Sequence, residues 1–399
     1  MPSFDLFSDD FFQNPYPVYR EMRKQEKAYW MPIQDRTKID GIWMVTRYRD
    51  VVSILRGSQT TSVDIKRLVP EPEWNAFDYT LLFSDPPDHT RLRALVADQF
   101  SNPRVRRLEA IISSTVDQLI DRLQDKETVE FQGEFALPLP VMVISGLLGT
   151  PMEDSEQLRT WSVDLMKGFD TTVTDAEFLR KQGKVLSDMS HYFTGLLARG
   201  RQPAGTIIEQ LAENTRAAAC SPQEALAHCL LMLVAGHETT VSLLCNGLLD
   251  LLNHPAELGK LRENPGLANL AIDEMLRCEA PLQRATFRAV TAPLKLSTQE
   301  VPPGQRVSAV IAAANRDPEQ FPDPDRFDIT RKPNRHMSFG LGLHKCLGER
   351  LARTEGRIAF NRLLQRIPSI ELAVDKPRWQ ARSLFRTLES LPLNLSGTC

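Results

Sequence analysis

The stretch "FGLGLHKCLGERLAR" (residues 339–353) places Cys346 between two glycine-rich turns and the start of a strong helical pattern. That pattern continues to residue 367. A helix N-terminus offers unpaired backbone N–H groups and a dipole that favours negative charge. We therefore expect the Cys346 thiol to lose its proton easily and to be a good metal ligand. A nucleophile and a small buried residue are the alternatives.

Composition limits the classes of protein to which the chain can belong. The 399 residues are 42% hydrophobic and 25% charged, which are ordinary globular values. The net charge of −3 gives no sign of a nucleic-acid partner. We find no run of about 18 apolar residues that could span a membrane. The N-terminus carries Asp5, Asp9 and Asp10 and lacks the basic and then apolar pattern of a signal peptide. These features predict a soluble, cytoplasmic protein.

The cysteines give no sign of a disulfide framework or a zinc site. No two of them form a C-x-x-C pair, and a cytosolic chain of this size does not need disulfides. Cys346 stands apart because of its glycine-rich surroundings. We interpret the others as small buried or terminal residues; they are Cys220, Cys229, Cys245, Cys278 and Cys399.

Helical periodicity dominates the chain, which has no internal repeat and no long linker. Helices are predicted at 49–56, 89–99, 104–125, 138–149, 154–168, 176–199, 205–216, 222–253, 255–262, 267–279 and 346–367. Short strands are predicted at 28–34, 41–46, 286–290, 294–297, 306–310 and 370–395. The expected fold class is mainly α with small peripheral β-sheets.

The predicted helix at 222–253 carries the most information. Ser221, Pro222 and Glu224 form a capping-box pattern at its start, and Pro255 follows its end. About 32 residues at ~1.5 Å each give a length of ~48 Å. Its centre is apolar on most sides and therefore buried, yet "GHETT" (236–240) brings in a carboxylate and two hydroxyls. A kinked core helix with a satisfied glutamate is the structural alternative to a functional site.

Four motifs, in this order along the chain, together resemble the cytochrome P-450 family of haem-thiolate monooxygenases. They are "AGHETT" with the acid–alcohol pair Glu238 and Thr239, E-x-x-R as Glu274 and Arg277, "NRDPEQFPDPDRFD" (315–328), and the cysteine loop with Phe339, Gly340, Gly342, His344, Cys346 and Gly348. E-x-x-R alone is commonplace on helices, whereas the cysteine loop is specific. The resemblance covers essentially the whole chain and is to the soluble bacterial branch.

The resemblance implies a single domain over residues 1–399, with haem b (iron protoporphyrin IX) between the long central helix and the cysteine-ligand helix. Cys346 would be the thiolate ligand of the iron, with backbone N–H groups at Leu347 and Gly348 directed at its sulfur. Four residues at matching positions would bind the haem propionates: His89, Arg93, Arg288 and His344. A solvated helix face is the alternative for His89 and Arg93, and Arg91 would point outward.

Oxygen activation would depend on the centre of the long helix. In the family pattern, Thr239 hydrogen-bonds the bound dioxygen or its water, and Glu238 relays protons. Ala235 and Gly236 would leave space above the iron. The resemblance also implies a buried structural network of Glu274, Arg277 and Arg326.

The substrate is expected to be a lipophilic small molecule, such as an intermediate of secondary metabolism, that is hydroxylated or epoxidised. Segments 58–84, 160–176, 228–240, 281–288 and 383–390 correspond to those that line the family's pocket. They supply the candidate substrate residues Leu82, Phe83, Phe169, Leu231, Val234 and Arg284. Arg284 would pair a substrate carboxylate, or else point to the surface or join a salt bridge.

Electrons from NAD(P)H would reach the haem, with O2 as co-substrate, through an external ferredoxin and ferredoxin reductase. A basic patch near the cysteine would steer an acidic ferredoxin; it consists of Lys345, Arg350, Arg353 and Arg357. An ordinary solvated helix face is the alternative. A haem-thiolate catalyst that uses peroxide or performs a rearrangement, and a non-enzymatic haem sensor or carrier, are the rival functions.

Overall fold

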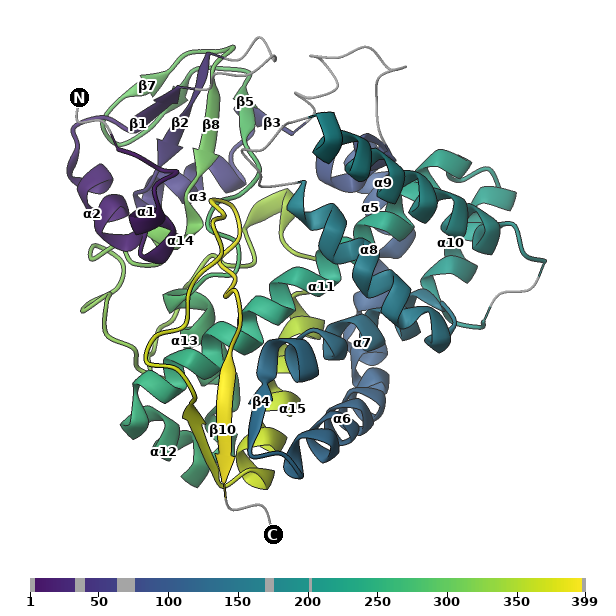
Figure 1. Ribbon diagram of the computed structural model, residues 1–399. Coiled ribbons are helices and arrows are strands. Elements are labelled where there is room, and N and C mark those ends of the chain that lie inside the picture. The colour runs from purple at the N-terminus through teal and green to yellow at the C-terminus, as the bar shows by residue number, and fades with distance from the viewer. Residues whose placement is uncertain (1–3, 33–39, 63–75, 169–175, 201–202, 397–399) are drawn as a thin grey trace.

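The computed structural model describes residues 4–32, 40–62, 76–168, 176–200 and 203–396. Helices dominate, as predicted, and the sheets are small and lie toward the edges (Figure 1). The α-helices are α1 (Asp9–Gln13), α2 (Tyr16–Lys24), α3 (Tyr48–Arg56), α5 (Asp88–Ala97), α6 (Asn102–Gln124), α7 (Pro138–Leu148), α8 (Ser155–Lys167), α9 (Ala176–Leu197), α10 (Ile207–Arg216), α11 (Pro222–Asn253), α12 (Pro255–Glu263), α13 (Ala268–Cys278), α14 (Ile311–Ala314) and α15 (Glu349–Arg366).

Short helical turns connect several of these helices. The 3-10 turns are η2 (Ala76–Tyr79), η3 (Leu81–Phe83), η4 (Asp98–Phe100), η6 (Met152–Asp154), η7 (Pro265–Leu267) and η8 (Gly342–His344), and η5 (Gln132–Ala136) is a π-turn. The turn η8 lies inside the loop that carries Cys346.

Within the described ranges, three sheets flank the helices. The largest has the order β1-β2-β8-β5-β3, in which β2 and β8 are parallel and the other neighbours are antiparallel. Its strands are β1 (Tyr29–Pro32), β2 (Gly41–Val45), β8 (Arg306–Ala309), β5 (Arg288–Val290) and β3 (Thr60–Thr61). The other two sheets have the orders β4-β10-β9 and β6-β7. They consist of β4 (Thr128–Glu130), β10 (Pro392–Ser396), β9 (Ser369–Leu372), β6 (Leu294–Lys295) and β7 (Glu300–Val301).

The predicted helix at 222–253 is confirmed as α11. The Ser221 hydroxyl accepts a hydrogen bond from the Glu224 N–H at 3.1 Å, and the Glu224 carboxylate accepts one from the Ser221 N–H at 2.8 Å. The helix crosses the middle of the molecule and packs against α7, α8, α9, α13 and α15 (Figure 1). Among the described residues α11 alone is long and apolar enough to span a membrane, and 83% of its most apolar window is buried. It is therefore the core helix of the fold.

Buried apolar side chains form two clusters. The larger surrounds α11, and the smaller lies between the N-terminal helices and the five-stranded sheet. The prediction of one domain over residues 1–399 stays a prediction.

The differences from the predicted elements have local causes. Helices α1, α2 and α14 were not predicted; α1 and α14 are only one turn long, and prolines lie at the start of α2, where the first helical turn tolerates them. The predicted strand region 370–395 contains two short strands, β9 and β10, and residues 379–388 fold back between them. Strand-like composition in this region did not distinguish the strands from the loop.

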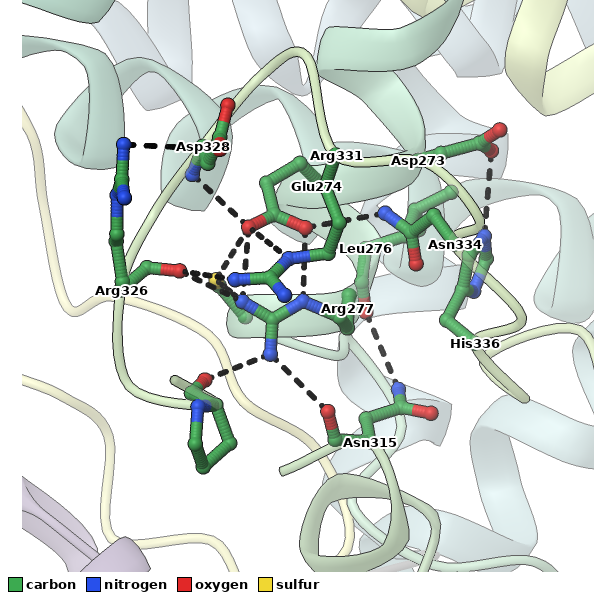
Figure 2. A network of polar contacts seen from close by, with 12 residues as sticks. Asp273, Glu274, Leu276, Arg277, Asn315, Arg326, Asp328, Arg331, Asn334 and His336 are labelled. Atoms are coloured by element: carbon green, nitrogen blue, oxygen red, sulfur yellow. Dashed lines mark hydrogen bonds and ion pairs between the residues drawn. The ribbon is translucent and has the colours of Figure 1, made fainter. Parts of the chain in front are cut away.

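A fully buried ion pair joins α13 to the segment that precedes the cysteine loop (Figure 2). The side chains of Glu274 and Arg277 are 0% exposed, with Arg277 Nε 2.7 Å from Glu274 Oε2. Arg277 also donates to the carbonyl oxygens of Asn315, Pro324 and Arg326. The predicted structural pair of Glu274 and Arg277 is therefore present, and its charged groups are hydrogen-bonded.

The prediction that the Arg326 side chain belongs to this network is wrong. That side chain is 64% exposed and lies 3.8 Å from Asp328, and only its backbone carbonyl enters the network. Arg331 takes the predicted place, because its Nε lies 3.1 Å from Glu274 Oε1 and its side chain is only 11% exposed. Both arginines lie in an irregular segment, where spacing does not indicate which side chain turns inward.

Candidate haem-thiolate site

The loop that carries Cys346 is held by backbone geometry. Gly340 and Gly342 have φ values of +65° and +71°, in the left-handed region that favours glycine. A Cβ on Gly342 would lie 2.4 Å from the carbonyl oxygen of Leu55 in α3. Gly342 is thus required by its own conformation and by the approach of α3. The Cys346 N–H donates to the Phe339 carbonyl at 2.8 Å and closes the loop.

The Cys346 thiol is reachable but enclosed. Cys346 keeps exposed surface, although protein surrounds it on most sides. Burial raises the pKa of the thiol, whereas the N–H groups of Gly348 and Glu349 lower it. The expectation that the free thiol loses its proton easily is therefore wrong, because α15 begins only at Glu349 and desolvation outweighs the N–H groups. Stable ionisation here calls for a metal, which is itself a charge partner for the thiolate.

Two histidine rings meet beside the cysteine loop. His89 of α5 is 0% exposed, and neither of its ring nitrogens has a hydrogen-bond partner among the described residues. Its ring centroid lies 4.4 Å from that of His344, whose Nδ1 is also buried without a partner. Burial, with the nearby His344 and Arg93, lowers the pKa of His89 to about 4. Buried polar atoms normally have hydrogen-bond partners. We therefore expect the unpaired ring nitrogens of His89 and His344 to bond to a group that the protein itself does not supply.

The two predicted propionate arginines differ in their surroundings. Arg288 of β5 is buried, its Nε has no hydrogen-bond partner in the part of the chain that the structure describes, and burial lowers its pKa. Arg93 is partly exposed and donates from Nη2 to the Lys345 carbonyl at 2.8 Å, which joins α5 to the cysteine loop. The donors of Arg288 and the two histidines fit the carboxylates of a haem. Arg91 points away as expected and pairs with Glu224 at 2.6 Å.

Asp85 is a residue of this site that the sequence interpretation missed. Its carboxylate accepts hydrogen bonds from Thr61 Oγ1 and from the Ser62 N–H, and lies 3.9 Å from His344 Nε2. Burial alone would raise its pKa, but hydrogen bonds involving His344, Thr61 and Ser62 outweigh burial and lower it to about 2. Asp85 thus puts a stable negative charge behind His344. Its position in "DPPDHT", just before His89, was the available signal.

The centre of α11 has an open face within its buried length. Ala235 is exposed and Thr239, four residues later, is partly exposed, so both lie on one helix face. Thr239 Oγ1 donates to the Ala235 carbonyl at 3.3 Å. The expectation that Gly236 contributes open space is not supported, because a Cβ there would lie 3.2 Å from two atoms of Ile144 in α7. Gly236 instead permits close packing of α11 against α7.

Glu238 is buried and ion-paired. Its Oε1 lies 2.5 Å from Arg382 Nη1 and accepts a hydrogen bond from Thr387 Oγ1 at 3.1 Å. The side chains of Glu238 and Arg382 are 7% and 12% exposed. The sequence indicated that a buried carboxylate in an apolar helix needs a partner, but not which of the many arginines supplies it.

The five apolar residues predicted to contact the substrate fall into three groups. Leu231 and Val234 of α11 are buried, whereas Leu82 and Phe83 of η3 are partly buried against the main apolar cluster. Phe169 lies outside the described residues. The apolar residues that remain candidates for substrate contact in the described structure thus lie on α11 and η3.

Arg284 is partly buried and donates from Nη2 to Ser383 Oγ at 2.9 Å. Within the described ranges it forms no ion pair. Of the two alternatives for Arg284, the salt bridge is thus absent from that part of the chain, and the side chain does not point freely to the surface.

The basic patch is largely compensated by acids of the same chain. Lys345 lies 2.5 Å from Glu349, and Arg357 lies 3.1 Å from Glu109. Arg353 contacts both Glu349 and Asp273. Of the four predicted cations, Arg350 alone forms no ion pair with a described residue. The excess positive charge of this patch is therefore smaller than the sequence indicated.

Comparison with known proteins agrees with this geometry. The family model described as "Cytochrome P450" matches residues 206–378. The chain is 37% identical over 392 residues to the biotin biosynthesis cytochrome P450 of Bacillus subtilis (strain 168), covering 97% of each chain. It is similar to the solved structure of myxobacterial CYP267B1 in complex with myristic acid, with TM-score 0.90, 38% identity and coverage of 98% and 99%. A complex of P450BioI with hexadec-9Z-enoic acid ligated acyl carrier protein has TM-score 0.89, 36% identity and coverage of 97% and 99%.

The fold and the cysteine loop thus define a haem-thiolate oxidoreductase. The chain belongs to the cytochrome P450 family, among the bacterial P450 monooxygenases. In this family haem is bound through a cysteine thiolate and reacts with O2. The partnerless buried donors of His89, His344 and Arg288 fit that cofactor.

Proposed function

We propose that this protein is a cytoplasmic monooxygenase that takes electrons from NAD(P)H through an external ferredoxin and ferredoxin reductase. It hydroxylates or epoxidises a lipophilic small molecule, as in the synthesis of a secondary metabolite. The observation that carries the proposal is the enclosed, reachable thiol of Cys346 beside buried histidine and arginine donors without partners. Together these groups match the thiolate ligand and the carboxylate contacts that a haem requires.

Cofactor binding is divided among separate parts of the chain. Cys346 would ligate the iron, with the N–H groups of Gly348 and Glu349 directed at its sulfur. His89, Arg93, Arg288 and His344 would hold the propionates, and Asp85 would orient His344. Bound haem would supply the iron centre at which O2 is reduced and one oxygen atom is passed to the substrate. Phe339 and Gly340 shape the loop that carries Cys346.

Proton delivery would depend on α11. The Thr239 hydroxyl lies on the open face of the helix and can hydrogen-bond a ligand there while keeping its contact with the Ala235 carbonyl. Glu238 Oε2 accepts no hydrogen bond from a described residue, so its lone pairs are available to water or a proton donor. A positioned acid that transfers protons typically contributes ~10²–10⁴-fold to the rate.

The substrate would be an apolar molecule that carries an acid group. Leu231, Val234, Leu82, Phe83 and Phe169 are the apolar candidates. Two similar structures contain a fatty acid and a fatty acyl group on an acyl carrier protein, which supports a long-chain acid or its thioester. Arg284, which has no ion pair in the described ranges, would bind a free carboxylate.

The partner protein would dock near the cysteine loop. Lys345, Arg350, Arg353 and Arg357 remain the proposed contact set, with Arg350 the cation least compensated by nearby acids. Leu343 is 42% exposed in η8 and would add an apolar contact. Since three of the four cations are paired, we expect only a modest effect of salt on association.

Oxygen consumption tests this function against peroxide-driven catalysis. The purified protein is given a ferredoxin, a ferredoxin reductase, NAD(P)H and a panel of lipophilic acids chosen by their haem spin-state shift. We expect O2 uptake that depends on all three redox components and yields an oxygenated product. Product formation from hydrogen peroxide alone, with no product from the reconstituted chain, would favour the peroxide-using alternative.

A further inference from the structure

The Glu238 carboxylate is anchored through one oxygen only. Both hydrogen bonds to its side chain, from Arg382 Nη1 and Thr387 Oγ1, reach Oε1, and no described residue donates to Oε2. Ser242 Oγ lies 2.8 Å from Thr387 Oγ1 and contacts the Glu238 carbonyl at 3.0 Å, which fixes the threonine hydroxyl against α11. The carboxylate therefore has a defined position and one oxygen without a protein donor.

Besides Glu238, Arg382 contacts α8 and a phenylalanine of its own segment. Its Nη2 donates to the Met166 carbonyl in the last turn of α8 at 2.9 Å, and its guanidinium lies 4.8 Å from the Phe385 ring centroid. We use the name terminal hairpin for residues 379–388, which are closed by the bridge between Trp379 and Leu388. One guanidinium thus connects the centre of α11, the end of α8 and the terminal hairpin.

These contacts make the position of the carboxylate depend on α8 and the terminal hairpin. If either segment moves, Arg382 must give up a contact or draw away from Glu238. A buried carboxylate that loses its cation is strongly destabilised, so it must take up a proton, acquire water or move. Each response changes the ability of Glu238 to transfer a proton.

We propose that Arg382 is a positioning residue that couples proton transfer by Glu238 to the packing of α8 and the terminal hairpin. This inference rests on the proposed function and on the expectation that segments 160–176 and 383–390, which overlap α8 and the terminal hairpin, line the substrate pocket. A substrate that packs these segments together keeps Glu238 paired through Oε1 and leaves Oε2 to exchange protons. A substrate that separates them disengages the acid.

Three variants separate positioning from simple structural support. Arg382→Gln removes the charge, Arg382→Lys keeps the charge but loses the planar fork that reaches two acceptors, and Glu238→Gln removes the acid. The matched control is Arg378→Gln, because Arg378 lies just before the terminal hairpin, is 57% exposed and pairs with Asp9 at 2.8 Å. A variant that affects only general stability should not change the fate of electrons in the folded, haem-loaded fraction.

The first readout is the share of electrons that appears in product rather than in peroxide, measured on haem-loaded protein with excess substrate. Arg382→Gln should lower that share several-fold, Arg382→Lys should lower it less, and Arg378→Gln should match the unmodified protein. The double variant with Glu238→Gln should be no worse than Glu238→Gln alone, because coupled residues are not additive. An unchanged share in Arg382→Gln, or a double variant that shows the sum of both losses, would overturn the proposal.

The second readout needs no turnover. Amide hydrogen exchange of the haem-loaded protein should become faster in the last turn of α8 and in the terminal hairpin when Glu238 is replaced by Gln, since the shared guanidinium loses its anion. Unchanged exchange in both segments would overturn the coupling, even in an enzyme that oxygenates its substrate normally. Failure of the proposed function is seen separately, as absence of O2-dependent product from the unmodified protein.

Discussion

Two buried glutamate–arginine pairs in this protein differ in how many hydrogen bonds the carboxylate oxygens accept from the protein. In the first pair, both carboxylate oxygens of Glu274 accept several hydrogen bonds, from Arg277, Arg331, Asn334 and the Asp328 N–H (Figure 2). In the second, Glu238 uses Oε1 alone, beside the open face of α11. A saturated network has no capacity left for a ligand, whereas a partly satisfied group can bind or exchange something.

The histidines His89 and His344 extend this contrast. His89 is 0% exposed, like Glu274, and the His344 side chain is 10% exposed, yet three of their four ring nitrogens have no hydrogen-bond partner among the described residues. Burying such groups without a bond costs free energy, so they indicate a site completed by another molecule. The share of hydrogen-bonding atoms that have a protein partner, rather than burial alone, distinguishes the structural polar groups from the functional ones.

The largest effect on stability is expected when the fully hydrogen-bonded pair of Glu274 and Arg277 is broken. Arg277→Leu should lower the free energy of unfolding by about 3–5 kcal/mol, because it leaves the Glu274 carboxylate buried without its main cation. Urea denaturation measures this. Arg326→Gln is the matched control and should stay within about 0.5 kcal/mol, since that side chain is exposed. If the two variants lose equal stability, the contrast between saturated and exposed arginines fails.

The next effect concerns the unsatisfied histidine. His89→Phe keeps a buried ring but removes the donor, and a hydrogen bond to a charged group contributes about 1.5–3 kcal/mol. We therefore expect haem affinity to fall by about ten- to a hundredfold, measured by haem transfer to an acceptor protein. Arg91→Gln, on the outward face of α5, should retain haem normally. Equal retention in His89→Phe and the unmodified protein would mean that His89 binds nothing.

The same residue predicts a pH dependence in the haem-free protein. The folded-state pKa of His89 is about 4, below its ordinary value near 6.5, so the unfolded state binds more protons between these values. Its contribution to stability is then complete above pH ~6.5 and is lost as the pH falls toward 4. His89→Phe should flatten this part of a plot of unfolding free energy against pH. An identical slope in both proteins would contradict the assigned shift.

A smaller effect is expected at Thr239, whose hydroxyl already has one partner. Thr239→Ala should bind substrate as before and consume NAD(P)H through the redox partners. It should divert electrons to peroxide, with a several-fold lower yield of product per electron. Thr239→Ser keeps a hydroxyl on the open face of α11 and is the control that should recover most of the yield. Unchanged coupling in Thr239→Ala would remove this residue from oxygen activation.

The smallest effect is expected at Arg284, a partly buried cation bonded to a single hydroxyl. If it is reserved for a ligand, the unmodified protein should prefer a lipophilic acid over its methyl ester. Arg284→Leu should lose that preference while it still binds the ester. Spin-state titrations of the four combinations measure this. The same acid-to-ester ratio in both proteins would show that Arg284 does not recognise substrate charge.

Regular and local features were predictable from the sequence. The start and end of α11 follow from a capping box and a following proline, both of which act through neighbouring residues. The cysteine loop was recognised because its glycines and cysteine form one continuous motif. Pairs on one helix face, such as Glu274 with Arg277, also follow from spacing alone.

Partners that are distant in sequence were not predictable. Arg382 reaches Glu238 across 144 residues, from a segment predicted as strand, and no periodicity points to it. The choice between Arg326 and Arg331 depends on how an irregular segment turns. Gly236 was assigned to open space because the sequence does not show that α7 packs against it. In each case the chemistry of the residue was predicted, but the direction in which its side chain points in the folded protein, or the element that packs against it, was not.

The most direct test of the account is the spectrum of the reduced, carbon-monoxide-bound protein. We expect the red-shifted Soret band that a cysteine thiolate gives to haem iron. Cys346→Ala should lose that band, whereas Cys220→Ala, which changes a buried cysteine between α10 and α11, should keep it. A protein that lacks the band, or a Cys346→Ala variant that retains it, would contradict the assignment of Cys346 as the thiolate ligand.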